Sequence, residues 1–218
     1  TYPDGEVVNA TYNAAMQAQI LSGAYNYVSD ATYNALGQIT KTVFGNGLNA
    51  QYRYYGLEFA SGTFYGRLRG ICVSNLQACG DTDASANVRM NVAYAYDRVK
   101  NITTIADRLR QERMSYAYDE LDRLTEWKQE TPYGSSTYVT QESYAYDKIG
   151  NIMSKTGVGN YTYLDGKPHA VTHINGLRVA SYDPNGNMTT RTESATYAQL
   201  FDIQNRLTDV NGVHFVYD

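Results

Sequence analysis

Apolar and polar residues alternate along several short segments of the chain. A period of two residues is typical of a β-strand that packs one face and leaves the other open to solvent. No stretch keeps the apolar stripe of an amphipathic helix over a useful length. Residues 14–21 contain helix-tolerant residue types, but they align with a turn and strand at 35–42. The clearest alternating positions are Val92, Tyr94 and Tyr96; Met114, Tyr116 and Tyr118; and Tyr144 and Tyr146. The pattern predicts an all-β chain.

The predicted strands end in a repeated motif. It opens with tyrosine and aspartate, has a turn-forming residue three positions after the aspartate, and has an aliphatic residue two positions further on. Repetition at variable spacing indicates one structural unit joined by loops of different length, and we expect about seven or eight such hairpins. Copies open at Tyr96, Tyr118, Tyr146, Tyr182 and Phe201, asparagine versions open at Tyr12 and Tyr33, and a last copy opens at Tyr217-Asp218.

Each motif predicts a tight turn between two antiparallel strands. The aspartate can accept hydrogen bonds from turn amides. The residue three positions later suits a positive φ after a type I turn, a slot that Lys100 and Met16 fit poorly. The same place in every unit favours turn capping over acid–base catalysis for these carboxylates. The predicted repeat-turn residues are Asp97, Asp119, Asp147, Gly150, Asp183, Gly186 and Asp202.

The predicted architecture is an array of antiparallel β-hairpins in a curved or spiral sheet, which would form a partial shell. We expect a single array over residues 1–218, with a degenerate, loop-containing unit at about residues 54–90. The chain starts at Thr1 without a methionine, and we expect it to be a piece of a longer protein. The open ends of such an array expose unpaired strand groups. These would pair with the remainder of the parent chain or with other copies.

Tyrosine takes the place of the usual aliphatic core. The chain has 22 tyrosines, 5 phenylalanines and a formal net charge of −4. Tyrosine rings can pack across strands while their hydroxyls reach a partner. A second interpretation is an exposed aromatic platform that stacks on sugar rings, with Trp127 as its best candidate. We favour packing, because neighbouring repeats must bury each other's faces.

The repeated motif resembles the YD-repeat, or Rhs-repeat, family. The pattern Tyr-Asp-x-x-Gly-Asn/Arg-Ile/Leu recurs over about residues 10–218, and the segment from Gly166 to Val171 is similar to a linker of bacterial members. The resemblance implies a β-sheet strip that spirals into a hollow shell, as in toxin-complex B and C components, Rhs effectors and teneurins. Such a shell encloses a toxin domain or presents an adhesive surface. Asp183-Pro184 lies in phase with the repeat turns, so no protease residue is carried over to this chain.

Other candidate chemistry is weakly supported. His169 and His173 lie in a predicted strand or loop without a third metal ligand nearby, and the segment from Asp183 to Asn187 matches a calcium loop poorly. The short arginine groups at 67–69 and 108–113 do not indicate nucleic-acid binding. We therefore expect no catalytic residue, no metal, no cofactor and no enzymatic activity.

The two cysteines, Cys72 and Cys79, flank a short polar segment. A disulfide fits an exported protein, and two reduced thiols are the alternative; we favour the disulfide. No apolar run is long enough to span a membrane as a helix. We expect an extracellular or cell-surface protein.

The functional hypothesis is structural. We expect a repeat segment of an extracellular shell, stalk or fibre that scaffolds or encapsulates, with self-assembly through its open ends. The expected partners are the parent chain, other copies and an enclosed toxin domain. The alternative hypothesis is an adhesion module that binds a glycan or a cell surface through exposed aromatic residues.

Overall fold

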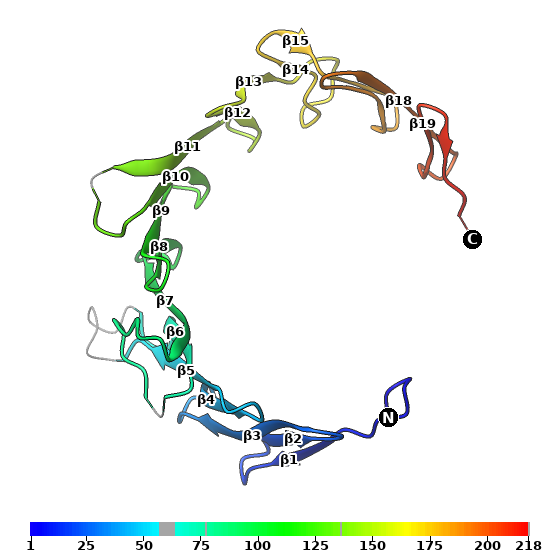
Figure 1. The fold of residues 1–218 in the computed structure, drawn as a ribbon. Coiled ribbons are helices and arrows are strands. Elements are labelled where there is room, and N and C mark those ends of the chain that lie inside the picture. Colours follow the sequence, from blue (N-terminus) through cyan, green and yellow to red (C-terminus); the bar gives the residue numbers. More distant parts are fainter. Residues whose placement is uncertain (57–63, 77, 136, 218) are drawn as a thin grey trace. The chain divides into compact units, whose positions relative to one another are not determined.

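The protein consists of β-strands joined by turns and loops (Figure 1). The computed structural model describes residues 1–56, 64–76, 78–135 and 137–217, and none of these residues lies in a helix. The strands are β1 (Asn9–Tyr12), β2 (Ala18–Ser22), β3 (Asn26–Tyr33), β4 (Ile39–Phe44), β5 (Asn49–Tyr54), β6 (Leu68–Ser74), β7 (Val88–Tyr96), β8 (Ile102–Asp107), β9 (Glu112–Tyr118), β10 (Leu124–Glu130), β11 (Tyr138–Tyr146), β12 (Ile152–Lys155), β13 (Gly159–Thr162), β14 (His173–Ile174), β15 (Leu177–Arg178), β16 (Ala180–Tyr182), β17 (Met188–Thr192), β18 (Thr196–Phe201), β19 (Leu207–Val210) and β20 (Val213–His214).

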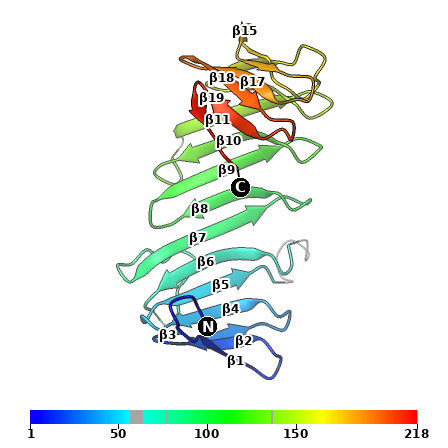
Figure 2. The ribbon, with the colours of Figure 1, turned by 90° about the vertical axis from the view of Figure 1, so that its right-hand side faces the viewer.

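The strands pair in chain order within two compact units, Thr1–Gln141 and Glu142–Asp218. In the first unit, each strand from β1 to β10 pairs antiparallel with the next one. The turns lie along the two edges of this sheet (Figure 2). In the second unit, pairing runs from β11 to β15, and β16 to β20 form a five-stranded sheet. The predicted array of antiparallel hairpins is confirmed.

The prediction of a single array over residues 1–218 stays a prediction. Parts of it fall outside the described residues: positions 57–63 and 77 of the degenerate unit, and Asp218 of the last motif.

In each repeat turn the amide of the fourth residue donates to the carbonyl of the first, and the fourth residue has a positive φ. In the turn after β11, the amide of Gly150 donates to the carbonyl of Asp147 at 3.3 Å, and the amide of Asp147 donates to the carbonyl of Asn151 at 3.0 Å. Gly150 has a φ of 95°. Met16 and Lys100, which fit this slot poorly by sequence, take the same conformation with φ of 60° and 92°. The rest of the turn therefore imposes the conformation even on a residue that disfavours it.

A β-bulge precedes the motif tyrosine in hairpin after hairpin. Tyr33 lies opposite Ile39, and Tyr96 lies opposite Ile102, with a register shift just before each tyrosine. The extra residue bends the strand and interrupts the regular ladder. Similar shifts occur before Tyr12, Tyr54, Tyr146, Tyr182 and Phe201.

The two faces of the first sheet differ in chemistry. Residues directly opposite one another across a ladder share a face. One face, here called the aromatic face, carries large side chains, among them Tyr52, Ile71, Val92, Tyr94, Ile105, Met114, Tyr116 and Trp127. The other face carries smaller and polar side chains, among them Gln51, Cys72, Asn91, Ala93 and Ala106.

Among the apolar residues, full burial is confined to small and medium-sized side chains. The buried apolar residues of the described chain are Ala31, Ala50, Cys72, Cys79, Val88, Ala106 and Ala180. The large side chains of the aromatic face stay half-buried, because a single sheet layer has no second layer to cover them. Bonds between neighbouring hairpins must therefore supply part of the stability.

Replacing Gly150 by valine should destabilise the fold by about 1–2 kcal/mol, because a β-branched residue disfavours positive φ. Space is not the cause, since no atom lies within 4 Å of the added Cβ. The measurement is thermal and denaturant unfolding. Gly80→Val is the control, because Gly80 has open space and no left-handed φ. Equal effects of the two substitutions would contradict the turn assignment.

Candidate functional site: turn clasps and tyrosine latches

The aspartate of each repeat motif closes its own turn. Asp147 Oδ1 accepts hydrogen bonds from the amides of Ile149 and Asn151, both at 2.9 Å, and its Oδ2 accepts from Asn151 Nδ2 at 2.8 Å. We call this five-residue arrangement the turn clasp. Further clasps pair Asp97 with Asn101, Asp119 with Arg123, Asp183 with Asn187 and Asp202 with Arg206.

The two asparagine versions of the motif use the opposite polarity. Asn34 Nδ2 donates to Gln38 Oε1 at 2.9 Å, and Asn13 makes the same bond to Gln17. Where the first residue is aspartate, the residue four positions later is asparagine or arginine, and it donates instead. The clasp therefore needs one donor and one acceptor at its ends, whichever residue supplies each.

The clasps keep their carboxylates ionised. The backbone amide of Arg123 lowers the pKa of Asp119, and the amide of Arg206 does the same for Asp202. Burial opposes the shift for Asp147, but hydrogen bonds from Asn151 still leave its pKa lowered. A pKa that is lower in the folded state stabilises the fold above the ordinary value near 3.8. That contribution is lost as the pH falls through the lowered pKa.

Most of the motif tyrosines bond to the preceding hairpin. Tyr118 Oη donates to the carbonyl oxygen of Ile102 at 2.8 Å, and Ile102 is the first residue of the preceding return strand. We call this bond the tyrosine latch. It recurs at 2.5–3.0 Å for Tyr33 to Ala18, Tyr54 to Ile39, Tyr96 to Leu68, Tyr163 to Ile152, Tyr182 to Val171 and Tyr217 to Leu207.

A bulge sets the acceptor of each of these latches except that of Tyr182, whose acceptor Val171 lies outside the strands. In the hairpin of Tyr96, the shift places Ile102 opposite that tyrosine, and Ile102 then accepts from Tyr118. Burial raises the pKa of Tyr118 and Tyr182, so both hydroxyls keep their proton at neutral pH. The two adjacent residues of the motif thus have different roles. The aspartate closes the turn of its own hairpin, and the tyrosine joins that hairpin to the preceding hairpin.

Phe201 stands where a latch tyrosine would stand. It opens the motif of Asp202 and pairs with Leu207 across the same bulge. Without a hydroxyl it cannot donate to the carbonyl of Met188, the first residue of the preceding return strand β17. The sequence substitution thus removes one latch from the series.

The segment from Gly166 to Val171 replaces a repeat turn without breaking the series of latches. The hydroxyl of Tyr163 donates to the carbonyl of Ile152 in the hairpin before, and the carbonyl of Val171 accepts from Tyr182 in the hairpin after. His169 Nδ1 lies 2.9 Å from Asn151 Oδ1, and Lys167 Nζ donates to the carbonyl of Pro184 at 3.1 Å. Sequence reasoning missed Tyr163 as a latch residue, because the aspartate after it is displaced by one position.

Side-chain amides also join neighbouring turns directly. Asn101 Nδ2 donates to Asp122 Oδ1 on the next turn at 2.8 Å, and Asn187 Nδ2 donates to Asn205 Oδ1 at the same distance. These bonds use the residue at positive φ, Asp122 or Asn205, as the acceptor. Adjacent turns are therefore held at a fixed spacing.

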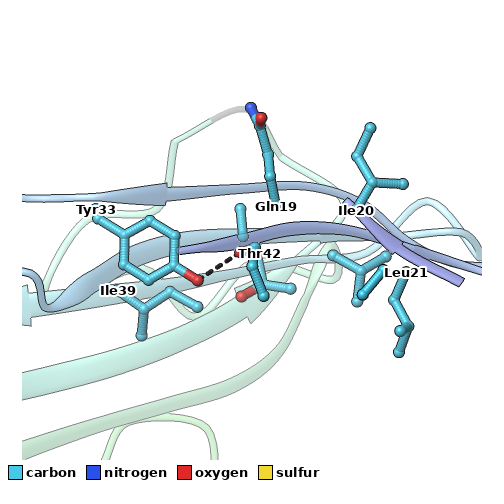
Figure 3. A pocket seen from close by; sticks show the side chains of 10 residues that line it. Gln19, Ile20, Leu21, Tyr33, Ile39 and Thr42 are labelled. Atoms are coloured by element: carbon cyan, nitrogen blue, oxygen red, sulfur yellow. Dashed lines mark hydrogen bonds between the residues drawn. The ribbon is translucent and has the colours of Figure 1, made fainter. Parts of the chain in front are cut away.

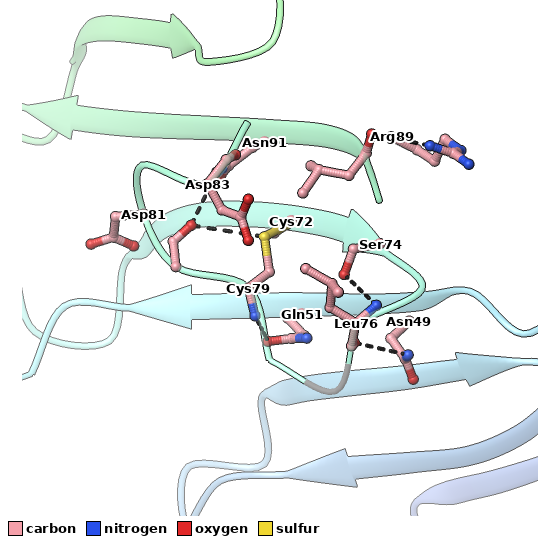
Figure 4. Close-up of a disulfide and its surroundings, with 12 residues drawn as sticks. Asn49, Gln51, Cys72, Ser74, Leu76, Cys79, Asp81, Asp83, Arg89 and Asn91 are labelled. Atoms are coloured by element: carbon pink, nitrogen blue, oxygen red, sulfur yellow. Dashed lines mark hydrogen bonds between the residues drawn. A yellow bond between two sulfur atoms is a disulfide. The ribbon is translucent and has the colours of Figure 1, made fainter. Parts of the chain in front are cut away.

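The two cysteines tie an inserted loop to the sheet (Figure 4). The structure joins Cys72 to Cys79, with their Cα atoms 6.2 Å apart. The loop at 78–87, here called the strap, lies against strands β5 to β7. Asn91, which is fully buried, donates to the carbonyls of Gly80 at 3.0 Å and Asp83 at 2.8 Å. Arg53 donates to the carbonyl of Cys79 at 3.2 Å. The oxidised state in solution stays a prediction.

An apolar hollow of about 210 Å³ lies over strands β1 to β4 (Figure 3). Its wall includes Ala10, Leu21, Val28, Ala31 and Tyr33. Ala10 and Ala31 lie two positions before a motif tyrosine. The same position holds Tyr52, Tyr94 or Tyr116 in later hairpins. The hollow is thus the space left by two missing aromatic rings, and its lining offers no acid or base.

The remaining candidate residues are dispersed. Trp127 lies half-buried in β10 directly opposite Tyr116. Within the described ranges, no three histidine, cysteine or carboxylate side chains gather around a possible metal position. The described part of the chain also contains no helix suited to crossing a membrane.

Solved structures share this fold of successive antiparallel hairpins over nearly the whole chain. One is the crystal structure of TcdB2-TccC3-Cdc42, with a TM-score of 0.63 and 21% identity over 94% of this chain. A second is TcdB2-TccC3 without the hypervariable C-terminal region, with a TM-score of 0.65 and 19% identity over 97%. A third is the Photorhabdus luminescens Tc holotoxin pore, with a TM-score of 0.54 and 19% identity over 95% of this chain. The chain has the YD-repeat fold. The resemblance noted from the motifs is confirmed at the level of fold.

The YD-repeat chain spans only 11–12% of these neighbours' lengths. No family model matches it, and no curated protein matches it. At these identities the likeness concerns the fold alone.

Asp119→Asn should lower the melting temperature, because the new amide would face the donating Nε of Arg123. Asp119→Asn with Arg123→Gln should recover it by copying the Asn34–Gln38 clasp. The double variant should also lose less stability than the wild type between about pH 7 and about pH 3, because its clasp does not titrate. The measurement is thermal unfolding across this pH range. A double variant less stable than the single one would contradict the clasp assignment.

Removing and adding a latch should have opposite effects. Tyr118→Phe should cost about 1 kcal/mol, the typical net value of a hydrogen bond, and Phe201→Tyr should gain up to about that much. Chemical denaturation measures both. Tyr65→Phe is the control, because Tyr65 is exposed and its hydroxyl makes no hydrogen bond within the described residues. Destabilisation by Phe201→Tyr would show that the latch geometry does not extend to this hairpin.

Proposed function

We propose that this chain is a wall segment of an extracellular YD-repeat protein, one that scaffolds or encapsulates and carries out no reaction of its own. The wall is a single β-layer in which each hairpin is fixed to the hairpin before it. The parent protein would be a shell, stalk or fibre. The role of the layer is mechanical and does not depend on which domain the parent protein encloses.

The tyrosine latch is the observation that carries the proposal. It recurs along the chain from Tyr33 to Tyr217, with an interruption at Phe201. A bond that always joins one hairpin to its predecessor makes the layer continuous, as in other repeat proteins whose units contact only their neighbours. Such a design favours extension of a surface over construction of one unique pocket.

The polar groups of the motif support the same conclusion. The carboxylates that could have served as acids or bases, such as Asp119 and Asp147, accept hydrogen bonds from their own turn amides. Their pKa values are lowered, which disfavours a role as a general acid at neutral pH. Structural use of these groups explains why the same residue type returns in each turn.

The open edge at β1 supports assembly with further strands. The strand is exposed along Asn9–Tyr12 and has one neighbour, β2. Tyr12 is a motif tyrosine whose hydroxyl has no acceptor within the described residues, and the ring is 56% exposed. An additional hairpin at this edge would complete both the strand ladder and the latch. Its source would be the parent chain or another copy.

The structural neighbours favour a toxin-type parent protein. Their titles name assemblies of TcdB2 and TccC3 and a Tc holotoxin pore. By analogy of fold we propose a secreted parent protein, with an enclosed toxin domain as one possible cargo. The alternative of glycan binding has less support, because Trp127 lies half-buried within the ladder opposite Tyr116.

The open edge gives a direct test of the wall proposal. The purified chain should form end-to-end polymers at high concentration in electron micrographs and in sedimentation velocity experiments. Thr11→Lys should suppress them, because a charge on an edge strand blocks further pairing. Thr82→Lys, on the strap, is the matched control and should leave the polymers unchanged.

Two results would contradict the wall proposal. One is a chain that stays unpolymerised at every concentration. The other is a glycan that shifts the fluorescence of Trp127 and whose binding is abolished by Trp127→Phe, which would support the adhesion alternative.

A further inference from the structure

The repeat turns of the first unit share a feature that the clasps and latches do not use. Each of the five strand connections along one sheet edge exposes a large apolar side chain, at the fourth turn position for Met16 and at the third for Leu36, Val99 and Leu121. These residues are Met16 (77% exposed), Leu36 (54%), Tyr65 (47%), Val99 (63%) and Leu121 (68%). We call this row the tip ridge. Because the turns are two strands apart, its members recur about every 10 Å.

The turn itself does not require apolar tips. In the clasp of Asp119, Leu121 contributes only its backbone amide. Asn185 occupies the same position in the turn of Asp183, and that turn keeps its clasp. The aliphatic side chains of Val99 and Leu121 therefore add nothing to their own turns, and each is exposed by more than 60%. Exposed apolar side chains on neighbouring turns are available for contact with another surface.

The opposite edge of the sheet is more polar. The turn between β4 and β5 presents Asn46 and Gly47, and the turn between β8 and β9 presents Arg110 and Gln111. Tyr25, on the turn between β2 and β3, is an exposed exception. The apolar row thus belongs to the edge of the repeat turns.

Two neighbouring tips carry opposite charges. Arg98 and Lys100 flank Val99, while Glu120 and Asp122 flank Leu121, and all four charged residues are exposed. Neither Arg98 nor Glu120 has an ion-pair partner among the described residues. The two turns are also fixed to each other, because Asn101 donates to Asp122 across the gap. The charge pattern is therefore presented at a constant spacing.

We propose that the Val99 and Leu121 turns of the tip ridge bind the same two turns of a second copy of this chain, in a two-fold symmetric dimer. The Val99 turn of each copy faces the Leu121 turn of the other. The apolar tips meet at the centre, and Arg98 pairs with Glu120 of the second copy. The two-fold axis makes each contact occur twice.

The charges select this register over the others. A dimer centred on the Val99 turns would bring Arg98 and Lys100 against themselves, and one centred on the Leu121 turns would bring Glu120 and Asp122 against themselves. Like charges placed opposite each other disfavour an interface. Only the register between the two turns pairs opposite charges on both sides. The matching repeat distance of about 10 Å also favours a partner of the same fold.

This sideways contact is distinct from end-to-end pairing at β1. It uses turn side chains, whereas the edge of β1 uses backbone groups. The inference does not depend on the proposed function, since a lateral dimer can form whether or not the chain is part of a wall. An experiment can therefore contradict the lateral dimer without contradicting the wall proposal, and the reverse.

A charge-exchange experiment tests the dimer. All variants carry Thr11→Lys, which removes end-to-end pairing, and sedimentation equilibrium gives the dimer dissociation constant. Arg98→Glu and Glu120→Arg should each weaken the dimer about tenfold or more, because each change acts twice in the symmetric interface. The combined variant should return to within about threefold of the parent value, since it restores both opposite-charge pairs.

Two further variants separate the apolar and charged contributions. Leu121→Asn should weaken the dimer without lowering the melting temperature, because asparagine already occupies this position at 185. Arg110→Glu is the control on the opposite edge and should leave the dissociation constant unchanged. Arg110 is mostly exposed, and its nearest carboxylate, on Asp107, is 3.8 Å away.

Three results would overturn the dimer. One is a parent chain that stays monomeric at every concentration. Another is a dimer that Arg98→Glu and Leu121→Asn leave unchanged. The third is a set of charge variants that change the melting temperature but not the dissociation constant, which would assign Arg98 and Glu120 to a contact within one chain.

Discussion

The structure depends on a hydrogen bond between hairpins that the backbone ladder alone does not supply. A single β-layer has no opposing layer, and its large side chains remain half-buried. Each tyrosine latch adds a bond from a half-buried hydroxyl to a carbonyl of the hairpin before, and a β-bulge places that carbonyl opposite the preceding tyrosine. The bulge and the tyrosine act together, because without the extra residue Ile102 would no longer lie opposite Tyr96. This requirement explains why tyrosine, with both a ring and a hydroxyl, takes the place of leucine in so many strands.

The turn clasp is the local counterpart of the latch. It lies within five residues and needs only a donor and an acceptor at its two ends, which the chain supplies either as Asp with Asn or Arg, or as Asn with Gln. It is strong enough to hold Met16 and Lys100 at positive φ. Because the clasp closes each turn locally and the latch joins neighbouring hairpins, the chain can carry insertions between its repeats. The strap and the linker from Gly166 to Val171 both interrupt the repeat, yet Tyr96 and Tyr182 on their far sides keep their latches.

A layer built this way uses its polar groups for its own construction. The motif carboxylates accept turn amides and the latch hydroxyls donate to carbonyls, so the chemistry left for contacts lies at edges, on the aromatic face and at turn tips. This distribution favours a scaffold, and it directs attention to the edges as the places where a partner can bind. The likeness to toxin-complex structures concerns the fold, and the chain covers only about a ninth of their length.

The sequence by itself determined the fold class, the hairpin repeat and the place of the motif turns, because a period of two residues and a five-residue clasp are local properties. Asp147 and Gly150 could be assigned to their turn from the letters alone. The acceptors of the latches, the strap contacts of Asn91 and the latch of Tyr163 were decided only by the tertiary structure. Those contacts join residues from 8 to 16 positions apart or more, and the bulge register and loop path that bring them together leave no short pattern in the sequence. The exposure of Val99 and Leu121 was likewise a tertiary result: an alternating pattern marks which residues share a strand face, but only the packing of neighbouring turns shows which side chains remain uncovered.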